Sequence, residues 1–203
     1  LRYVWLKTDG SSELVTLITA SESSMASEKL PDALSGVAGV AGIAWSVQGG
    51  RGNAIRGSDP KVLAGEAALR PSIAGVTCEV GPLGFLQPNP EVAALAWRRL
   101  TESDAGGALA LDLYAGSGVT TGLLRERFER VLPCESYPES AARLGIEPVP
   151  VSAFLQQQLE QGARPDLVVS NPPRAGMGAE VSAQVRLLGA ARLQIMSCSA
   201  ASL

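Results

Sequence analysis

Residues 109–122 of the 203-residue chain read LALDLYAGSGVTTG, and this stretch decides the fold. An apolar run interrupted by one carboxylate leads into a loop with glycines at 116, 118 and 122. Such a run, followed by a helical pattern, predicts a strand, a tight loop and the start of a helix. Glycine lets the backbone approach a ligand closely, and a helix start offers unpaired N–H groups. Considered alone, the loop is explained equally well as an ordinary tight turn between strand and helix.

A carboxylate at the end of this predicted strand distinguishes the loop from a nucleotide-binding one. The spacing G-x-G-x-x-x-G misses the dinucleotide fingerprint by one residue, and Asp112 lies four residues before Gly116. A carboxylate there would repel a pyrophosphate, whose binding depends on the positive end of a helix. It favours a cationic ligand with an amino group and no phosphate, and S-adenosylmethionine is such a ligand.

Composition limits the class of protein. Hydrophobic residues make up 46% and charged residues 18% of the chain, as in an ordinary soluble globular protein, and no run approaches the roughly 20 apolar residues of a membrane span. The absence of histidine excludes Ser-His-Asp and Cys-His catalysis and most transition-metal sites. Three cysteines without paired spacing indicate no disulfide framework, zinc site or iron–sulfur cluster, so a reducing cytoplasm is expected. A net charge of −3 gives no basic signature for nucleic acid, although an RNA-binding module could lie elsewhere.

The pattern predicts two regions. Residues 1–82 are expected to form a small α/β region, with strands at 2–7, 13–19 and 37–47, a helix within 24–34 and a loop at 48–60. Residues 83–203 alternate between helix and strand, which predicts a doubly wound, mostly parallel sheet. The expected elements there are a helix at 91–100 capped by Asn89, strands at 109–114, 130–134, 148–151, 166–170 and 192–197, and helices at 120–127, 153–161 and 179–190.

Polar residues follow or end several of these strands. Asp112, Glu135, Asn171 and Cys198 should therefore gather at the carboxyl edge of the sheet, where doubly wound folds bind ligands. Glu135 lies 23 residues after Asp112, close to the spacing of an acidic residue that binds a ribose hydroxyl pair. A solvated glutamate is the alternative. Cys198 is a candidate nucleophile at that edge, although an isolated cysteine is more often a small buried apolar residue.

Two further segments carry groups suited to a flat heterocycle. Two prolines after Asn171 hold it at a strand end, where its carboxamide can read a base edge or simply cap a turn. Phe85, Gln87 and Asn89 alternate along GPLGFLQPNP, so an extended segment would place them on one face, where an aromatic ring and two carboxamides could stack on and hydrogen-bond a base. A proline-rich linker with incidental polar residues is the alternative.

Four segments together resemble the uracil-5 RNA methyltransferases, the family that makes 5-methyluridine. They are FLQPNPEVA (85–93), LDLYAGSGVTTGLL (111–124), SNPPRAGMG (170–178) and MSCSAASL (196–203). The similarity is greatest to the 23S ribosomal RNA branch, which carries NPPR-x-G, and residues 1–19 are similar to the central subdomain of that branch. The resemblance implies a methyltransferase fold of the S-adenosylmethionine-dependent type, acting on ribosomal rather than transfer RNA, in the cytoplasm, with no membrane and no metal.

The resemblance also assigns roles to residues. Cys198 would attack uracil C6, which makes C5 nucleophilic enough to take a methyl group. S-adenosylmethionine would be held by Gln87, Asp112, Tyr114, Gly116, Gly118, Glu135 and Asn171. The uracil would contact Phe85, Gln87, Asn171 and Arg174.

The chain also departs from the family pattern. Ser199 stands where asparagine is usual after the cysteine, and Ser152 where an acidic residue is common. The family's general base is a glutamate C-terminal to the cysteine, and its N-terminal RNA-binding module has no counterpart in these residues. We therefore expect a chain truncated at both ends that binds the cofactor and lacks turnover. Two alternatives stay open: an amino-group methyltransferase of adenine or glutamine that uses Asn171, Pro172 and Pro173, and a catalytically silent binding module.

Overall fold

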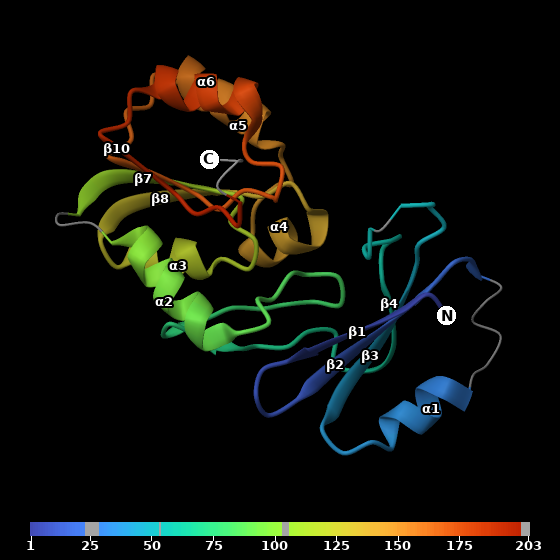
Figure 1. Cartoon of the computed structure of the whole chain (residues 1–203). Coiled ribbons are helices and arrows are strands. Elements are labelled where there is room, and N and C mark those ends of the chain that lie inside the picture. Colours follow the sequence, from blue (N-terminus) through green and yellow to red (C-terminus); the bar gives the residue numbers. More distant parts are fainter. Residues whose placement is uncertain (23–28, 53, 103–105, 200–203) are drawn as a thin grey trace. The chain divides into compact units, whose positions relative to one another are not determined.

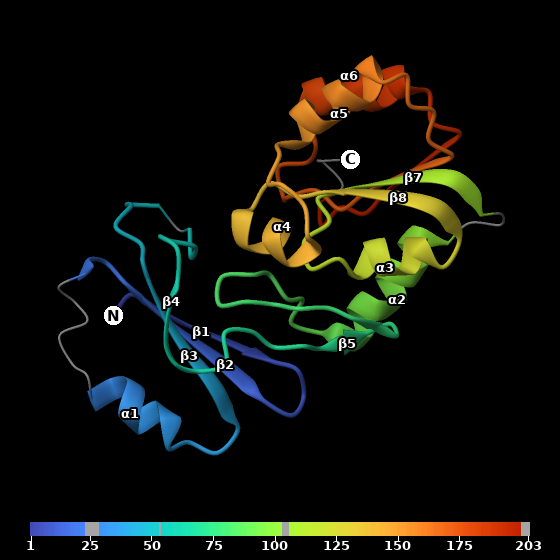
Figure 2. The same ribbon diagram turned by 180° about the vertical axis from the view of Figure 1, so that it is seen from behind.

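The structure is a computed structural model that describes residues 1–22, 29–52, 54–102 and 106–199. The chain divides into two compact units (Figures 1 and 2). Unit 1 takes residues 1–72 and 79–86, and unit 2 takes residues 73–78 and everything from residue 87 onward. The predicted boundary at 82/83 falls inside the second segment of unit 1. In the described part of the chain, no helix is long and apolar enough to cross a membrane.

Unit 1 is a four-stranded sheet with the order β1-β2-β3-β4. The predicted hairpin is confirmed as β1 (Tyr3–Thr8) paired with β2 (Glu13–Thr19), and Asp9 closes its turn by accepting the Ser11 and Ser12 N–H groups. Helix α1 (Lys29–Ser35) then leads to β3 (Val40–Val47), which runs parallel to β2. The first part of the predicted 24–34 helix lies outside the described residues. Strand β4 (Lys61–Gly65) was not predicted.

A short hairpin was also not predicted. Strands β5 (Ser72–Ile73) and β6 (Val76–Thr77) are joined by Ala74 and Gly75, whose φ angles are 57° and 88°. Two positive φ angles in a two-residue loop define a type I′ turn, which asparagine and glycine prefer. Ala74 therefore holds an L side chain in the left-handed region, at a local cost in free energy.

Replacing Ala74 by asparagine is expected to raise the free energy of unfolding by about 1 kcal/mol, because asparagine tolerates the left-handed conformation better than alanine. Urea denaturation followed by circular dichroism measures the difference. The matched change Ala74→Val should lower stability, because a β-branched side chain is poorly tolerated at positive φ. Equal stability of the two variants would contradict the strain assigned to Ala74.

Unit 2 is a three-layer α/β unit around a parallel sheet with the order β10-β9-β7-β8. Helices α2 and α3 lie on one face of the sheet, and α5 and α6 lie on the other (Figure 1). This confirms the predicted doubly wound parallel fold. The elements in chain order are α2 (Pro90–Thr101), β7 (Gly107–Leu113), α3 (Val119–Arg125), β8 (Phe128–Cys134), α4 (Pro138–Leu144), α5 (Val151–Glu160), β9 (Leu167–Ser170), α6 (Gly178–Leu188) and β10 (Arg192–Ile195).

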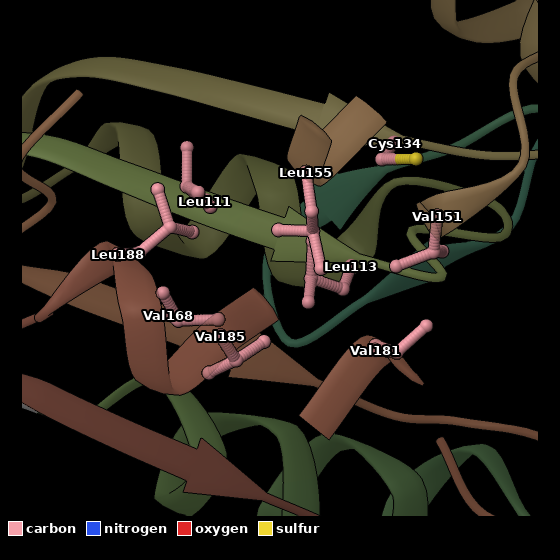
Figure 3. Packing of buried hydrophobic residues seen from close by; sticks show 9 residues of the cluster. All are labelled: Leu111, Leu113, Cys134, Val151, Leu155, Val168, Val181, Val185 and Leu188. Atoms are coloured by element: carbon pink, nitrogen blue, oxygen red, sulfur yellow. The ribbon is translucent and has the colours of Figure 1, made fainter. Parts of the chain in front are cut away.

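Side-chain alternation along β7 explains how this sheet buries both faces. Leu111 and Leu113 point into the apolar cluster under α5 and α6, together with Leu155 and Leu188 (Figure 3). Asp112 between them faces the opposite layer, where it meets α3. The period of two in a strand thus places a carboxylate on the α3 side of an otherwise apolar strand.

The strand predicted at 148–151 is wrong. Pro148 and Pro150 have no N–H to donate to a ladder, so only the Val149 N–H bonds across, to the Glu135 carbonyl at 2.9 Å. Helix α5 then begins at Val151, with Pro150 as its N-cap residue. The short segment before it still accommodates a helix, α4, which ends at Gly145 with a φ of 69°. By contrast, Asn89 is confirmed as the N-cap of α2 through its Oδ1, which accepts the Val92 N–H at 3.0 Å.

Candidate functional site at the carboxyl edge of the parallel sheet

The order of strands locates the candidate site. Strand β7 lies between β8 and β9, and the chain moves from β7 to β8 on one side and later returns to β9 on the other. The carboxyl end of β7 is therefore a topological switch point, where loops diverge and leave a crevice. The glycine loop that follows β7 occupies this position.

The loop backbone adopts an unusual conformation. Tyr114, Gly116 and Gly118 have φ angles of 61°, 58° and 82°. The Ala115 N–H donates to the Cys134 carbonyl at 3.0 Å, and the Gly118 N–H donates to the Ala115 carbonyl at 2.9 Å. A tyrosine in the left-handed region of φ/ψ space costs conformational free energy and persists only where the surrounding structure enforces it. Such strained residues are typical of ligand-binding loops.

The two glycines of this loop are needed for different reasons. A Cβ built on Gly118 would lie 2.5 Å from Leu144 Cδ2, so Gly118 permits α4 to pack against the start of α3. A Cβ built on Gly116 would meet only the Tyr114 carbonyl oxygen, at 3.9 Å. Space is therefore open beside Gly116, and a ligand can approach the backbone there.

Glu135 lies beside this loop, at the end of β8. Its Oε2 accepts the Gly116 N–H at 2.8 Å, and its Oε1 accepts the Ser136 and Tyr137 N–H groups at 2.8 and 2.7 Å. Three backbone donors hold the half-buried carboxylate in one orientation. The structure thus brings together two of the predicted cofactor residues, Gly116 and Glu135, although they are 19 residues apart.

Asp112 is 1% exposed, and its carboxylate binds helix α3. Its Oδ2 accepts the hydroxyls of Thr120 and Thr121 at 2.7 and 2.6 Å. Burial raises the pKa of Asp112 from 3.8 to about 6. The hydrogen bonds from the two hydroxyls act in the opposite direction and lower the pKa, but burial has the larger effect. In this arrangement the carboxylate fixes the first turn of α3 to β7 and so fixes the loop between them. Direct contact of Asp112 with a ligand stays a prediction.

The pKa of Asp112 predicts how Asp112→Asn will affect stability. Because the folded-state pKa lies above the ordinary value, the wild type is most stable with Asp112 protonated and loses stability as the pH rises from about 4 to 6. At pH 8 this pKa shift lowers the free energy of unfolding of the wild type by about 3 kcal/mol. The neutral amide of Asp112→Asn can recover at most this amount. We expect the melting temperature of Asp112→Asn, relative to wild type, to rise with pH across this window. A pH-independent difference would contradict the buried carboxylate.

Asn171 also reaches the switch point. Its N–H donates to the Leu113 carbonyl at 3.4 Å, which ties it to the end of β7. The Oγ of the preceding Ser170 is fully buried and has no hydrogen-bond partner among the described residues. The end of β9 therefore presents a half-buried carboxamide beside an unsatisfied hydroxyl, and polar groups of this kind are usually paired.

The remaining predicted residues are more loosely placed. Cys198 is an exposed thiol three residues beyond β10, in a bend where the Ser199 N–H donates to Ser197 Oγ at 3.1 Å. Arg174 is exposed in the loop after β9. Gln87 is half-buried at the start of the long segment of unit 2, whereas Phe85 belongs to unit 1 and is 51% exposed. Their assigned roles stay predictions.

The two threonines that hold Asp112 were not predicted. Their signal was a pair of adjacent hydroxyl residues in the first turn of the helix that follows the loop. A groove of about 350 Å³ was also not predicted, and it contains none of the predicted site residues. Arginines and glutamates share its lining, so it presents no uniformly basic surface: Leu95, Arg98, Arg99, Thr101, Glu102, Leu123, Glu126 and Arg127.

Known proteins similar to this chain include RNA methyltransferases, although no protein-family model matches it. The chain is 31% identical over 175 residues to an uncharacterized RNA methyltransferase of Geobacter sulfurreducens, covering 79% of the chain and 35% of that relative. It is 27% identical over 205 residues to an uncharacterized RNA methyltransferase of Enterococcus faecalis, covering 94% of the chain and 45% of the relative. The chain thus spans less than half the length of either relative.

A solved structure shares the fold. The Pyrococcus abyssi tRNA (uracil-54, C5)-methyltransferase, in complex with S-adenosyl-L-homocysteine, superposes with a TM-score of 0.68 at 20% identity. The likeness covers 93% of this chain and 47% of that structure. The chain therefore has the fold of the S-adenosylmethionine-dependent methyltransferases, as its sequence predicted.

Proposed function

We propose that this chain is the cofactor-binding part of an RNA methyltransferase that transfers a methyl group from S-adenosylmethionine to C5 of uridine. The observation that carries the proposal is Glu135, fixed by three backbone N–H groups beside the open face of Gly116. An acidic side chain in this place suits a ribose hydroxyl pair. The similarity to RNA methyltransferases supports RNA as the substrate.

The residues at the switch point fit this cofactor. Gly116 leaves room for its backbone approach, Glu135 offers carboxylate oxygens to the ribose, and Asn171 offers a carboxamide at the neighbouring strand end. The unsatisfied Ser170 hydroxyl next to Asn171 is a further donor and acceptor at that end. When bound, S-adenosylmethionine supplies an electrophilic methyl group.

Cys198 supplies the nucleophile in this proposal. Its thiolate adds to C6 of the uracil, which forms an S–C6 bond and leaves C5 electron-rich enough to accept a methyl group. Loss of the C5 proton to a base and cleavage of the S–C6 bond then restore the double bond and the free thiol. The exposed position of Cys198 leaves it accessible to an RNA base.

Ribosomal RNA is the proposed substrate class, because Asn171, Pro172, Pro173 and Arg174 reproduce the motif of that branch. Transfer RNA is the competing class, since the structural neighbour is a tRNA (uracil-54, C5)-methyltransferase.

Calorimetry and nucleoside analysis together test the proposal. Titration of the chain with S-adenosylmethionine should show binding, whereas titration with NAD should show none. Ribosomal and transfer RNA that lack modifications are then incubated with the protein and the cofactor, digested and analysed by mass spectrometry for 5-methyluridine. Formation of 5-methyluridine would support the uridine C5 reaction and would overturn the expectation that this chain lacks turnover. Binding of NAD in place of S-adenosylmethionine would contradict the cofactor. N6-methyladenosine as the product would favour the amino-group alternative.

A further inference from the structure

The β5–β6 hairpin packs against the helix that follows the glycine loop. A Cβ built on Gly122 would lie 2.5 Å from Cγ1 and 2.8 Å from Cγ2 of Val76. Gly122, the third glycine of the sequence motif, therefore admits the hairpin against α3. On the other side of the turn, Arg98 of α2 donates a hydrogen bond to the Ala74 carbonyl. Both helices on this face of the sheet thus hold the hairpin.

The residue that directly follows the hairpin reaches the glycine loop itself. Cys78 is 6% exposed, and its thiol forms a side-chain hydrogen bond with Ser117, the residue between Gly116 and Gly118. Burial raises the pKa of the Cys78 thiol, so it stays neutral at physiological pH and acts as a hydrogen-bonding group, not as a nucleophile.

The loop needs such support because of its backbone conformation. Tyr114 is strained at a φ of 61°, whereas Gly116 and Gly118 adopt positive φ without strain. A loop that contains a strained residue keeps its shape only where several contacts fix it. Glu135 holds the loop at the Gly116 N–H. Cys78, which follows β6, holds the loop at Ser117, the next residue. The two contacts together leave Gly116 in the conformation that faces open space.

We propose that the β5–β6 hairpin positions the glycine loop for the cofactor, with Cys78 as the positioning residue that contacts Ser117. This inference rests on the proposed function, because it assumes that the loop binds S-adenosylmethionine. It assigns a role in binding to a segment that lies more than 30 residues before the glycine motif in the sequence.

The test compares Cys78→Ala, Cys78→Ser and the neighbouring exposed control Thr77→Ala in the full chain. Loss of one hydrogen bond should weaken S-adenosylmethionine binding by roughly three- to tenfold in Cys78→Ala. Cys78→Ser, whose hydroxyl can still bond to Ser117, should restore most of the affinity, and Thr77→Ala should match the wild type. Isothermal titration calorimetry gives the affinities. Equal affinity of the wild type and Cys78→Ala would overturn the proposal.

Hydrogen exchange without cofactor separates this proposal from the proposed function. In Cys78→Ala the amides of residues 116–118 should exchange faster, while those of Gly107–Leu113 in β7 keep their protection. A merely structural role would instead accelerate exchange in the loop and the strand alike. If the wild type binds no S-adenosylmethionine, the proposed function fails, and the exchange pattern alone decides whether the hairpin holds the loop.

A second pair of variants addresses the packing contact. Gly122→Ala should increase exchange in the loop and weaken binding, because its methyl group displaces Val76. Adding Val76→Ala removes the obstructing methyls and should recover part of the loss. A double variant no better than Gly122→Ala would contradict the packing argument.

Discussion

Replacing Cys198 by alanine is expected to abolish the covalent adduct between this protein and an RNA that contains 5-fluorouridine. Fluorine at C5 cannot leave as a proton does, so the S–C6 bond persists after methyl transfer and the adduct accumulates. Alanine has no nucleophile, and we expect the yield to fall by at least about 10³-fold, as when other covalent nucleophiles are removed. A denaturing gel with labelled RNA resolves the adduct.

The control for this result is cofactor affinity. Cys198 is exposed and lies beyond the last strand, so Cys198→Ala should keep the fold and the affinity for S-adenosylmethionine. Cys78 and Cys134 are buried and cannot replace it. An adduct of undiminished yield in Cys198→Ala would exclude Cys198 as the nucleophile. If the wild type binds the cofactor but forms no adduct, either RNA binding requires segments outside this chain or the protein does not catalyse the uracil-5 reaction.

The parallel sheet could be predicted because its strands carry strong local signals. Strand β7 is apolar apart from one carboxylate and is followed by a glycine loop, and β8 and β9 are short runs followed by Glu135 and by Asn171. The hairpin at 72–77 and the strand β4 were missed because two to five residues with mixed exposure carry no clear period. At residues 148–151 a strand was predicted where none exists, because the valines favour a strand but the prolines prevent one.

The candidate site was predictable only as a location. Strand ends converge in any doubly wound sheet, so Gly116, Glu135 and Asn171 could be placed at one edge from their order in the sequence. The hydrogen-bond partners of each side chain could not be predicted, because they depend on how the elements pack in three dimensions. The sequence alone favoured Asp112 as a ligand for a cation, whereas the structure buries it against two threonines.

Removing those two hydroxyls is expected to destabilise the protein strongly. The double variant Thr120→Val/Thr121→Val keeps the shape of both side chains but takes away the donors to Asp112 Oδ2. An ionised carboxylate would then be buried without these partners, and hydrogen bonds to charged groups contribute about 1.5–3 kcal/mol each. We expect a loss of about 3–5 kcal/mol at pH 8, which corresponds to a drop of roughly 10 °C in melting temperature.

The pH dependence identifies the cause of this loss. The hydroxyls lower the pKa of Asp112, so without them the folded-state pKa rises further above its ordinary value and protonation removes most of the penalty. The deficit of the double variant should therefore be small near pH 4 and grow as the pH rises toward 8. Adding Asp112→Asn should recover most of the lost stability at pH 8, because the buried charge is gone.

Thr101→Val provides the matched control for these measurements. Thr101 is equally buried in α2, but its hydroxyl bonds a neutral carbonyl, that of Trp97, at 2.9 Å. Its replacement should cost about 1 kcal/mol or less at every pH. If the double variant at 120 and 121 behaves like Thr101→Val, Asp112 is not held as a buried carboxylate. In that case Asp112 would not help to position the glycine loop, and the loop would be held only by the hairpin and Glu135.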